Sequence, residues 1–239
     1  SLDSIGAIPS YDAMRTVITV LASGNPSINE KLVSGPYEVG GIAPMGAAYL
    51  FVKDRTIDTV SELSGKSIAV LEYDSAQASM ASRVGMSPVM SDITNFSGRF
   101  NNGSVDICFA PIAAYSALEL YKGMQPDGGM IDYVLGQLTA QVILKKDRFP
   151  DGFANSSRKY MLGQFDRAMT VIENANNEVD KKWWIRIPEA DKLRYDEMMR
   201  EARIALTNDG VYSKDMMSLL RKVRCKEEPS RAECVNPVE

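Results

Sequence analysis

Three consecutive polar residues are the clearest candidates for chemical function in this chain. Tyr73, Asp74 and Ser75 come after a short apolar run, residues 68–71, and before a helical pattern. An apolar run of this length, bounded by turn residues, is typical of a buried strand. In open α/β sheets, ligands bind at the carboxyl ends of strands, beside the starts of the following helices. We therefore predict a ligand site here, although Asp74 or Ser75 could simply cap the helix.

Further polar side chains stand where later strands are expected to end or return. Each has a plain structural alternative: a helix cap for the first pair, aromatic packing for the tyrosine and a half-exposed strand for the last pair. Amides and hydroxyls on a strand can orient a ligand. The predicted ligand-binding set is completed by Asp92, Asn95, Pro111, Tyr115, Gln137 and Thr139.

The chain contains no histidine, which removes the usual general base and the commonest metal ligand. Every Ser-His or Cys-His catalytic arrangement is excluded for the same reason. A carboxylate enzyme remains as an alternative, in which Asp74 or Asp92 would act with Lys66 as acid and base. That hypothesis needs a strongly shifted pKa, which nothing in the sequence demands. We predict no enzyme, no cofactor and no metal.

The three cysteines divide into one pair and one single residue. Cys225 and Cys234 flank a short polar segment that contains proline, and we expect them to form a disulfide rather than remain two free thiols. Closing this loop would stabilise the fold by about 2.7 kcal/mol on the chain-entropy model. A disulfide implies an oxidising compartment. Cys108 lies in an apolar strand and is expected to be a small buried hydrophobe, or to pair with sequence outside this chain.

Bulk composition is that of an ordinary globular protein. The chain has 239 residues, of which 45% are apolar and 24% charged, and its net charge is −4. Its basic residues are scattered among acids, so we expect no nucleic-acid partner. The apolar runs are too short to span a bilayer, and no signal peptide is visible.

Periodicity predicts alternating strands and helices in the middle of the chain. Strands 67–71, 88–90 and 105–110 alternate with helices that begin near residues 75, 93 and 111, the last running to residue 121. This order favours a parallel sheet with helices on its faces. Ile93 is expected to point inward from the second helix.

The flanking segments predict two long strands and a helical end. Residues 37–52 are extended and glycine-rich, and residues 131–144 form a second long strand. Residues 161–179 carry one continuous apolar stripe, and a helix from Pro188 buries Leu193 among others. Ser10 caps a first helix, and Ser213 caps a last one.

The order of these segments resembles the solute-binding proteins of tripartite ATP-independent periplasmic (TRAP) transporters. The similar stretches are ELSGKSIAV (62–70), VGMSPV (84–89), FNNGSVD (100–106), APIAAY (110–115) and VILKKDRFP (142–150). The resemblance covers residues 37–239 and rests on order and spacing. It implies an α/β fold of the type II periplasmic-binding-protein architecture, with two lobes, mainly parallel sheets and long C-terminal helices.

Two departures from that family bear on the site. Residues 1–35 are too few and too helical to supply the family's opening strand-helix-strand units, so we expect the front of the first lobe to be absent. The family's carboxylate-binding arginine corresponds to Ala69 here. An arginine fork is the natural bidentate partner of a carboxylate. Its loss, with Glu72, Asp74 and Asp92 nearby, favours a neutral, hydroxylated or cationic ligand.

The resulting prediction is an extracytoplasmic solute-binding protein of the DctP-like type. Residues 1–50 would form part of lobe I, residues 51–135 lobe II, and residues 136–239 the return strand and helices of lobe I. The protein would be a periplasmic monomer that closes on a small polar metabolite and delivers it to a membrane permease. The alternative is a sensing module of the same fold that acts on a signalling partner.

Overall fold

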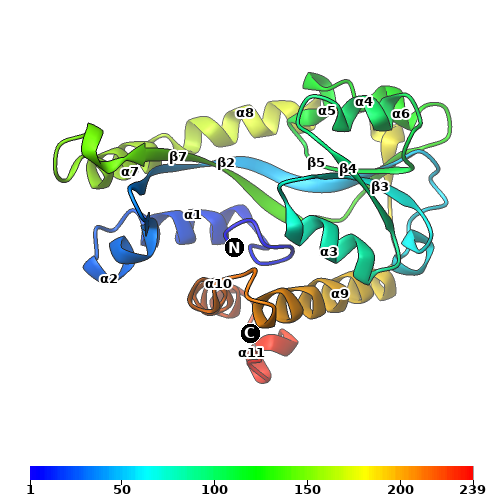
Figure 1. The fold of residues 1–239 in the computed structure, drawn as a ribbon. Helices are drawn as coiled ribbons and strands as arrows, with labels where there is room; N and C mark the ends of the chain where they lie inside the picture. The colour runs from blue at the N-terminus through cyan, green and yellow to red at the C-terminus, as the bar shows by residue number, and fades with distance from the viewer. Residues whose placement is uncertain (239) are drawn as a thin grey trace.

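A single long strand, β2 (Tyr37–Val52), organises the computed structural model, which describes residues 1–238 (Figure 1). It belongs to an eight-stranded sheet of order β4-β3-β5-β2-β6-β8, and β1 and β7 also pair with β2. The other strands are β1 (Val33–Ser34), β3 (Ser67–Leu71), β4 (Ser87–Ser91), β5 (Ile107–Pro111), β6 (Gly129–Ile131), β7 (Gly136–Lys145) and β8 (Trp184–Ile185).

The predicted parallel unit is confirmed in the middle of the chain. Strands β3, β4 and β5 run parallel, with Ala69 opposite Val89 on one side and opposite Cys108 on the other. The whole sheet is mixed rather than mainly parallel, because β2 runs antiparallel to β1, β5, β6 and β7. One end of β2 pairs with β7 and the other with β5 and β6, so this strand joins the two halves of the molecule.

Helices cover both faces of the sheet, as Figure 1 shows, with α4, α5, α6 and α8 on one face and α1, α3 and α9 on the other. The α-helices are α1 (Tyr11–Leu21), α2 (Pro26–Asn29), α3 (Ser75–Arg83), α4 (Phe96–Asn101), α5 (Ala114–Ala117), α6 (Tyr121–Met124), α7 (Phe153–Gly163), α8 (Phe165–Asn177), α9 (Glu189–Asn208), α10 (Lys214–Glu227) and α11 (Ala232–Val235). Short 3₁₀ turns lie at Glu30–Leu32, Val60–Leu63, Lys146–Arg148 and Lys181–Trp183. The predicted caps of α1 and α10, Ser10 and Ser213, accept from Ala13 N and Met216 N.

Three predicted elements are each divided in two. Residues 131–144 are not one strand: β6 and β7 pair with different parts of β2, because the chain turns between them. The helix expected after Pro111 breaks into α5 and α6 at Glu119, whose φ is 52°, in the left-handed region that ends a helix. The stripe over residues 161–179 belongs to α7 and α8, and Gly163 ends the first of them.

Two predicted core positions are wrong. Ile93 is 61% exposed, because it lies in the loop before α4 and not on the helix itself. Leu193 is 69% exposed, because α9 buries the face that carries Tyr195, Met199 and Leu206 instead. Ala202, predicted on the same stripe, is buried, so the error of periodicity lies at the start of the helix.

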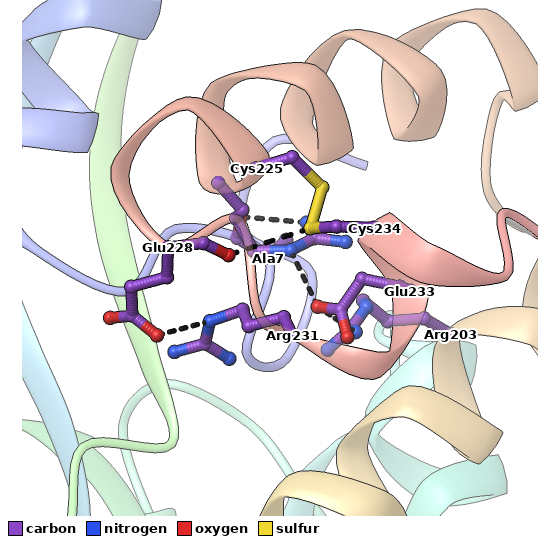
Figure 2. The surroundings of a disulfide bond; sticks show 8 residues. Ala7, Arg203, Cys225, Glu228, Arg231, Glu233 and Cys234 are labelled. Carbon is purple, nitrogen blue, oxygen red and sulfur yellow. Dashed lines mark hydrogen bonds and ion pairs between the residues drawn. A yellow bond between two sulfur atoms is a disulfide. The ribbon is translucent and has the colours of Figure 1, made fainter.

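The predicted disulfide is present and fastens the C-terminal segment (Figure 2). Cys225 of α10 is bonded to Cys234 of α11. Glu233, which precedes Cys234, is buried. Its Oε1 lies 3.1 Å from Nε of Arg224 and 3.5 Å from Nη2 of Arg203. Arg224 also donates to the carbonyl of Ala7 at 2.8 Å. The C-terminal segment is thereby tied to α9, α10 and the N-terminal segment through buried charge.

Candidate functional site

The carboxyl ends of β3 and β4 meet at one edge of the sheet. Leu71 ends β3 opposite Ser91, which ends β4, and Glu72 N donates to Ser91 O at 2.9 Å. The loops that follow, residues 72–74 and 92–95, therefore leave the sheet side by side. This edge holds five of the predicted ligand-binding residues: Tyr73, Asp74, Ser75, Asp92 and Asn95.

The loop after β3 is held by two local hydrogen bonds. Asp74 caps α3, with its Oδ1 accepting from Gln77 N at 3.0 Å, and Gln77 Oε1 accepts from Leu71 N at 2.9 Å. Ser75 is the first residue of α3, and Tyr73 is 69% exposed. The cap accounts for one carboxylate oxygen of Asp74, and the tyrosine ring stands free at the surface.

The loop after β4 is also closed on itself. Asp92 Oδ1 accepts from the backbone of Thr94 at 2.7 Å and of Asn95 at 3.0 Å, while Asn95 Nδ2 donates to Asp92 Oδ2 at 2.8 Å. Hydrogen bonds from Thr94 and then from Asn95, with the charge of Arg99 after them, lower the pKa of the Asp92 carboxyl. Asp92 is therefore an anion that shapes its own loop.

Tyr115 and Gln137 are buried rather than displayed. Tyr115, on α5 shortly after Pro111, packs its ring 5.8 Å from that of Tyr121, and burial raises its pKa. Gln137 is 3% exposed, and its Oε1 has no hydrogen-bond partner among residues 1–238. Pro111 lies opposite Ala48, and Ala48 lies opposite Gly136, so β5, β2 and β7 bring Pro111 and Gln137 into one region.

Thr139 is hydrogen-bonded to Asp3, a residue that the sequence did not single out. Its Oγ1 donates to Asp3 Oδ1 at 2.6 Å, and its N–H donates to Asp3 Oδ2 at 3.2 Å. Asp3 as a whole is an exposed residue, but neighbouring protein reduces the solvation of its carboxylate and so raises its pKa. The hydrogen bonds of Thr139 oppose that rise, and the charge of Asp74 adds to it.

Tyr212 is the second residue that the sequence did not indicate. Burial and then the negative charge of Asp74 raise its pKa to about 12, so its hydroxyl keeps its proton at neutral pH. The N-terminal segment runs beside α3 in Figure 1, and the α9–α10 connection approaches it from below. Asp3, Asp74, Thr139 and Tyr212 therefore come from four separate parts of the chain into one polar region.

No pattern in the sequence could have revealed Asp3 or Tyr212. Asp3 stands in an irregular segment interrupted by glycine and proline, and Tyr212 stands in the turn between two helices. Their position depends on long-range packing, such as the 2.9 Å ion pair between Arg83 of α3 and Asp209.

Arginine is scarce at this edge. Ala69, at the position of the family arginine, is 3% exposed within β3. Arg83 forms an ion pair with Asp209. Arg99 lies close enough for its charge to lower the pKa of Asp92, and its buried Nε has no hydrogen-bond partner among residues 1–238. Arg99 is thus the arginine at this edge that could meet a carboxylate.

The acid–base pair that an enzyme would need is not assembled. Lys66 immediately precedes β3, whereas Asp74 follows it, so the whole strand separates the two residues. The charge of Lys66 instead acts on Asp54 and Asp106. This geometry removes the sequence-based argument for Lys66 as the partner of Asp74 or Asp92.

Comparison with known proteins decides the family. The whole chain, residues 1–239, matches the family model described as solute-binding protein AdeT 1/2. The chain belongs to this family. It is 42% identical over 234 residues to probable solute-binding protein AdeT1 of Acinetobacter baumannii, covering 98% of this chain and 76% of the relative. It is 26% identical to probable solute-binding protein AdeT2 of the same organism, covering 98% of each.

Solved structures show the same fold at low sequence identity. A TRAP periplasmic solute-binding protein from Desulfovibrio salexigens with bound orotic acid has a TM-score of 0.76 at 16% identity, covering 94% of this chain and 74% of that one. DctP6, an extracytoplasmic solute receptor of Bordetella pertussis binding pyroglutamic acid, has a TM-score of 0.70 at 18% identity, covering 92% and 73%. A protein of the same kind from Haemophilus influenzae with bound L-gulonate has a TM-score of 0.73 at 12% identity, covering 93% and 74%.

These comparisons confirm the predicted α/β fold, which two-lobed TRAP solute-binding proteins share. They also confirm the prediction of a solute-binding protein rather than an enzyme. Among residues 1–238, no helix is long and apolar enough to cross a membrane.

Proposed function

We propose that this protein captures a small polar solute at the carboxyl edge of β3 and β4 and delivers it, in the periplasm, to a membrane permease. Family membership supports the binding role. The observation that carries the location is the convergence of Asp3, Asp74, Thr139 and Tyr212 beside the two strand ends. Ligands of open α/β sheets bind at such edges.

The proposed solute is hydroxylated or cationic. The solved structures bind carboxylic acids such as orotic acid and pyroglutamic acid. In this chain the proposed site contains the carboxylates of Asp3 and Asp74, and Ala69 stands at the arginine position. Two carboxylates repel an anionic ligand and accept hydrogen bonds from hydroxyl or ammonium groups. A second candidate, an organic acid held by Arg99, is favoured only by the unpartnered Nε of that residue.

Thermal unfolding with a panel of neutral polyols, amines and carboxylic acids tests both points. A ligand that binds only the folded protein raises the midpoint in proportion to its affinity. We expect a polyol or an amine to bind, and Asp74→Asn to weaken that binding by about tenfold or more, since hydrogen bonds to a charged group contribute about 1.5–3 kcal/mol. Asp151→Asn, on the turn before α7, is the matched control and should leave the affinity unchanged.

The results of this panel distinguish an error in the ligand class from an error in the location of the site. Binding of an acid that is lost in Arg99→Ala would overturn the proposed ligand class and leave the binding role intact. Binding that Asp74→Asn does not change would move the site away from the β3 edge.

A further inference from the structure

The C-terminal disulfide is accompanied by an ion pair between the residues that precede its two cysteines. Arg224 precedes Cys225 and Glu233 precedes Cys234, and Nε of Arg224 donates to Oε1 of Glu233 at 3.1 Å. The disulfide and the ion pair therefore each join positions nine residues apart. Both charged side chains are buried. We call residues 228–234 the C-terminal latch, because the disulfide holds the Glu233 carboxylate of this segment inside the protein.

A tight turn near the start of the chain packs against the same buried charges. Residues 4–7 form this turn, in which Ala7 N donates to Ser4 O at 3.0 Å. Gly6 has a φ of +62°, and a Cβ at this position would lie 2.7 Å from Nη1 of Arg203. The turn therefore depends on a glycine at this position and lies directly on the Arg203 guanidinium.

Two arginines connect the latch to the turn, and Figure 2 shows Arg203, Glu233 and Ala7 around the disulfide. Nη1 of Arg203 donates to Ile5 O at 3.1 Å, and Nη1 of Arg224 donates to Ala7 O at 2.8 Å. Each arginine also contacts Oε1 of Glu233 through another of its nitrogens. A guanidinium is a planar, rigid fork, so a carboxylate at one N–H fixes the direction of the others. Glu233 therefore orients both donors that hold the turn.

The turn in its place sets the position of Asp3. Asp3 immediately precedes the turn, and Gly6 N donates to Leu135 O at 2.7 Å, which fixes the turn beside the start of β7. Asp3 thereby reaches Thr139, whose Oγ1 and N–H both donate to its carboxylate. The contacts thus run without interruption from the disulfide to a carboxylate of the candidate site.

We propose that the C-terminal latch positions Asp3 for solute binding, through Glu233, two arginines and the turn at residues 4–7. Glu233, Arg203 and Arg224 are then positioning residues, which act through Asp3. The inference rests on the proposed function for the role of Asp3, whereas the coupling of the latch to Asp3 can be measured without a solute. Release of the latch should weaken solute binding by about tenfold, the effect of losing one hydrogen bond to a charged group.

Hydrogen exchange at the Thr139 amide, followed by NMR, reports the position of Asp3 directly. This N–H donates to Asp3 Oδ2, so Asp3→Ala gives the exchange rate that follows from loss of the carboxylate. The double variant Cys225→Ser/Cys234→Ser and the single variant Glu233→Gln should each exchange about tenfold faster than wild type at Thr139, towards the Asp3→Ala rate. Wild-type exchange at Thr139 in both variants overturns the proposal.

Two control variants separate positioning from a general loss of stability. Leu120→Ala removes a fully buried side chain between α5 and α6 and should destabilise the whole protein. Glu228→Gln breaks an exposed ion pair within the latch itself. Both should leave the Thr139 amide at the wild-type exchange rate. If Leu120→Ala accelerates that exchange as much as Glu233→Gln does, Thr139 reports global stability and the proposal is wrong.

The coupling should also act in the opposite direction, because an interaction free energy between two sites is reciprocal. Gly6→Ala disturbs the turn while the disulfide stays intact, since the added Cβ would collide with Arg203. The Cys234 amide, which donates to Arg231 O at 2.9 Å, should then exchange faster than in wild type. Asp3→Ala leaves the turn in place and should not change this amide. Unchanged exchange at Cys234 in Gly6→Ala shows that the turn and the latch are independent, which overturns the proposal.

The exchange experiment and the solute panel fail separately. Wild-type exchange at Thr139 in the latch variants, together with a solute that Asp74→Asn weakens, overturns the positioning role alone. Faster exchange in those variants supports the coupling of the latch to Asp3 even if the panel contradicts the proposed solute.

Discussion

Gln137 is a buried polar residue whose position folding alone does not explain. Its side chain is 3% exposed, yet its Oε1 has no hydrogen-bond partner among residues 1–238. A buried acceptor without a partner costs about 1–3 kcal/mol. Proteins accept such costs mainly at functional sites. A donor group of the bound solute would satisfy this oxygen.

Replacing Gln137 by methionine tests that interpretation. Gln137→Met keeps the shape of the side chain and removes the unsatisfied oxygen, so unliganded protein should gain about 1 kcal/mol of unfolding free energy. Affinity for the solute should fall about tenfold. Urea unfolding measures the first quantity and calorimetric titration the second. Gln164→Met, between α7 and α8, should change neither; a solute affinity unchanged in Gln137→Met would remove Gln137 from the site.

Glu233 is the buried charge on which the C-terminal segment depends. It makes ion pairs with Arg224 and Arg203 at once. Glu233→Gln should lower the unfolding free energy by about 3 kcal/mol, the range found when one partner of a buried pair is removed. Glu228→Gln is the control: it breaks an exposed pair with Arg231 and should cost less than about 1 kcal/mol. Equal losses in the two variants would show that the buried cluster contributes little.

The same carboxylate predicts a pH dependence. Burial raises the pKa of Glu233, but a backbone hydrogen bond and the charges of Arg203, Arg224 and Arg231 outweigh burial and hold it below 4.5. A group whose pKa is lower in the folded state contributes stability above its unfolded pKa and loses it as the pH falls through the folded value. Urea unfolding should therefore show wild-type stability declining below about pH 4.5. Glu233→Gln should decline less over that range.

At the scale of elements, β2 depends on a glycine where it passes from one half of the molecule to the other. Gly46 stands at a bulge in the pairing of β2 with β7, with φ at +101°. A Cβ there would also lie 3.2 Å from side-chain carbons of Ile112 and Ile172. Any other residue at position 46 would be strained, both by the positive φ and by the close packing.

Gly46→Ala should therefore destabilise the protein by about 1–3 kcal/mol. Gly98→Ala is the matched substitution, because Gly98 lies in α4 with open space around its Cα, and alanine there should add up to about 1 kcal/mol. Thermal and urea unfolding of both variants give the comparison. A tolerated Gly46→Ala would mean that the bulge relaxes at no cost.

The elements with local signals could be predicted from the sequence. The strand at 67–71 and the caps Ser10 and Ser213 are set by apolar runs and side-chain oxygens within a few residues, and all are found as expected. The division between β6 and β7 was missed, because both halves are apolar and their separation depends on which part of β2 each one meets. The exposed position of Leu193 could not be predicted either, because tertiary packing decides which face of α9 is buried there.

The candidate site divides in the same way. Asp74 and Asp92 could be predicted, because each follows a strand and starts a helix or loop within a local pattern. Asp3 and Tyr212 could not, because only the packing of distant segments brings them to Asp74. Local patterns indicate the edge of the sheet, and tertiary structure supplies the residues that complete it.

At the scale of the whole molecule, the chain combines the fold of TRAP solute-binding proteins with a proposed site that contains two carboxylates. The solved structures from Desulfovibrio salexigens and Haemophilus influenzae bind orotic acid and L-gulonate, whereas the site proposed here contains the carboxylates of Asp3 and Asp74. The protein remains a solute-binding protein by family. Its solute should therefore differ in charge from those of the solved structures.

Native mass spectrometry of the protein purified gently from its source tests this account most directly. The native mass is compared with the denatured, unreduced mass of the same sample. We predict an added small molecule that leaves on denaturation and is neutral or cationic when identified. A carboxylic acid in that position would contradict the proposed ligand class. No adduct, even after incubation with a metabolite library, would contradict the capture of a solute by this chain.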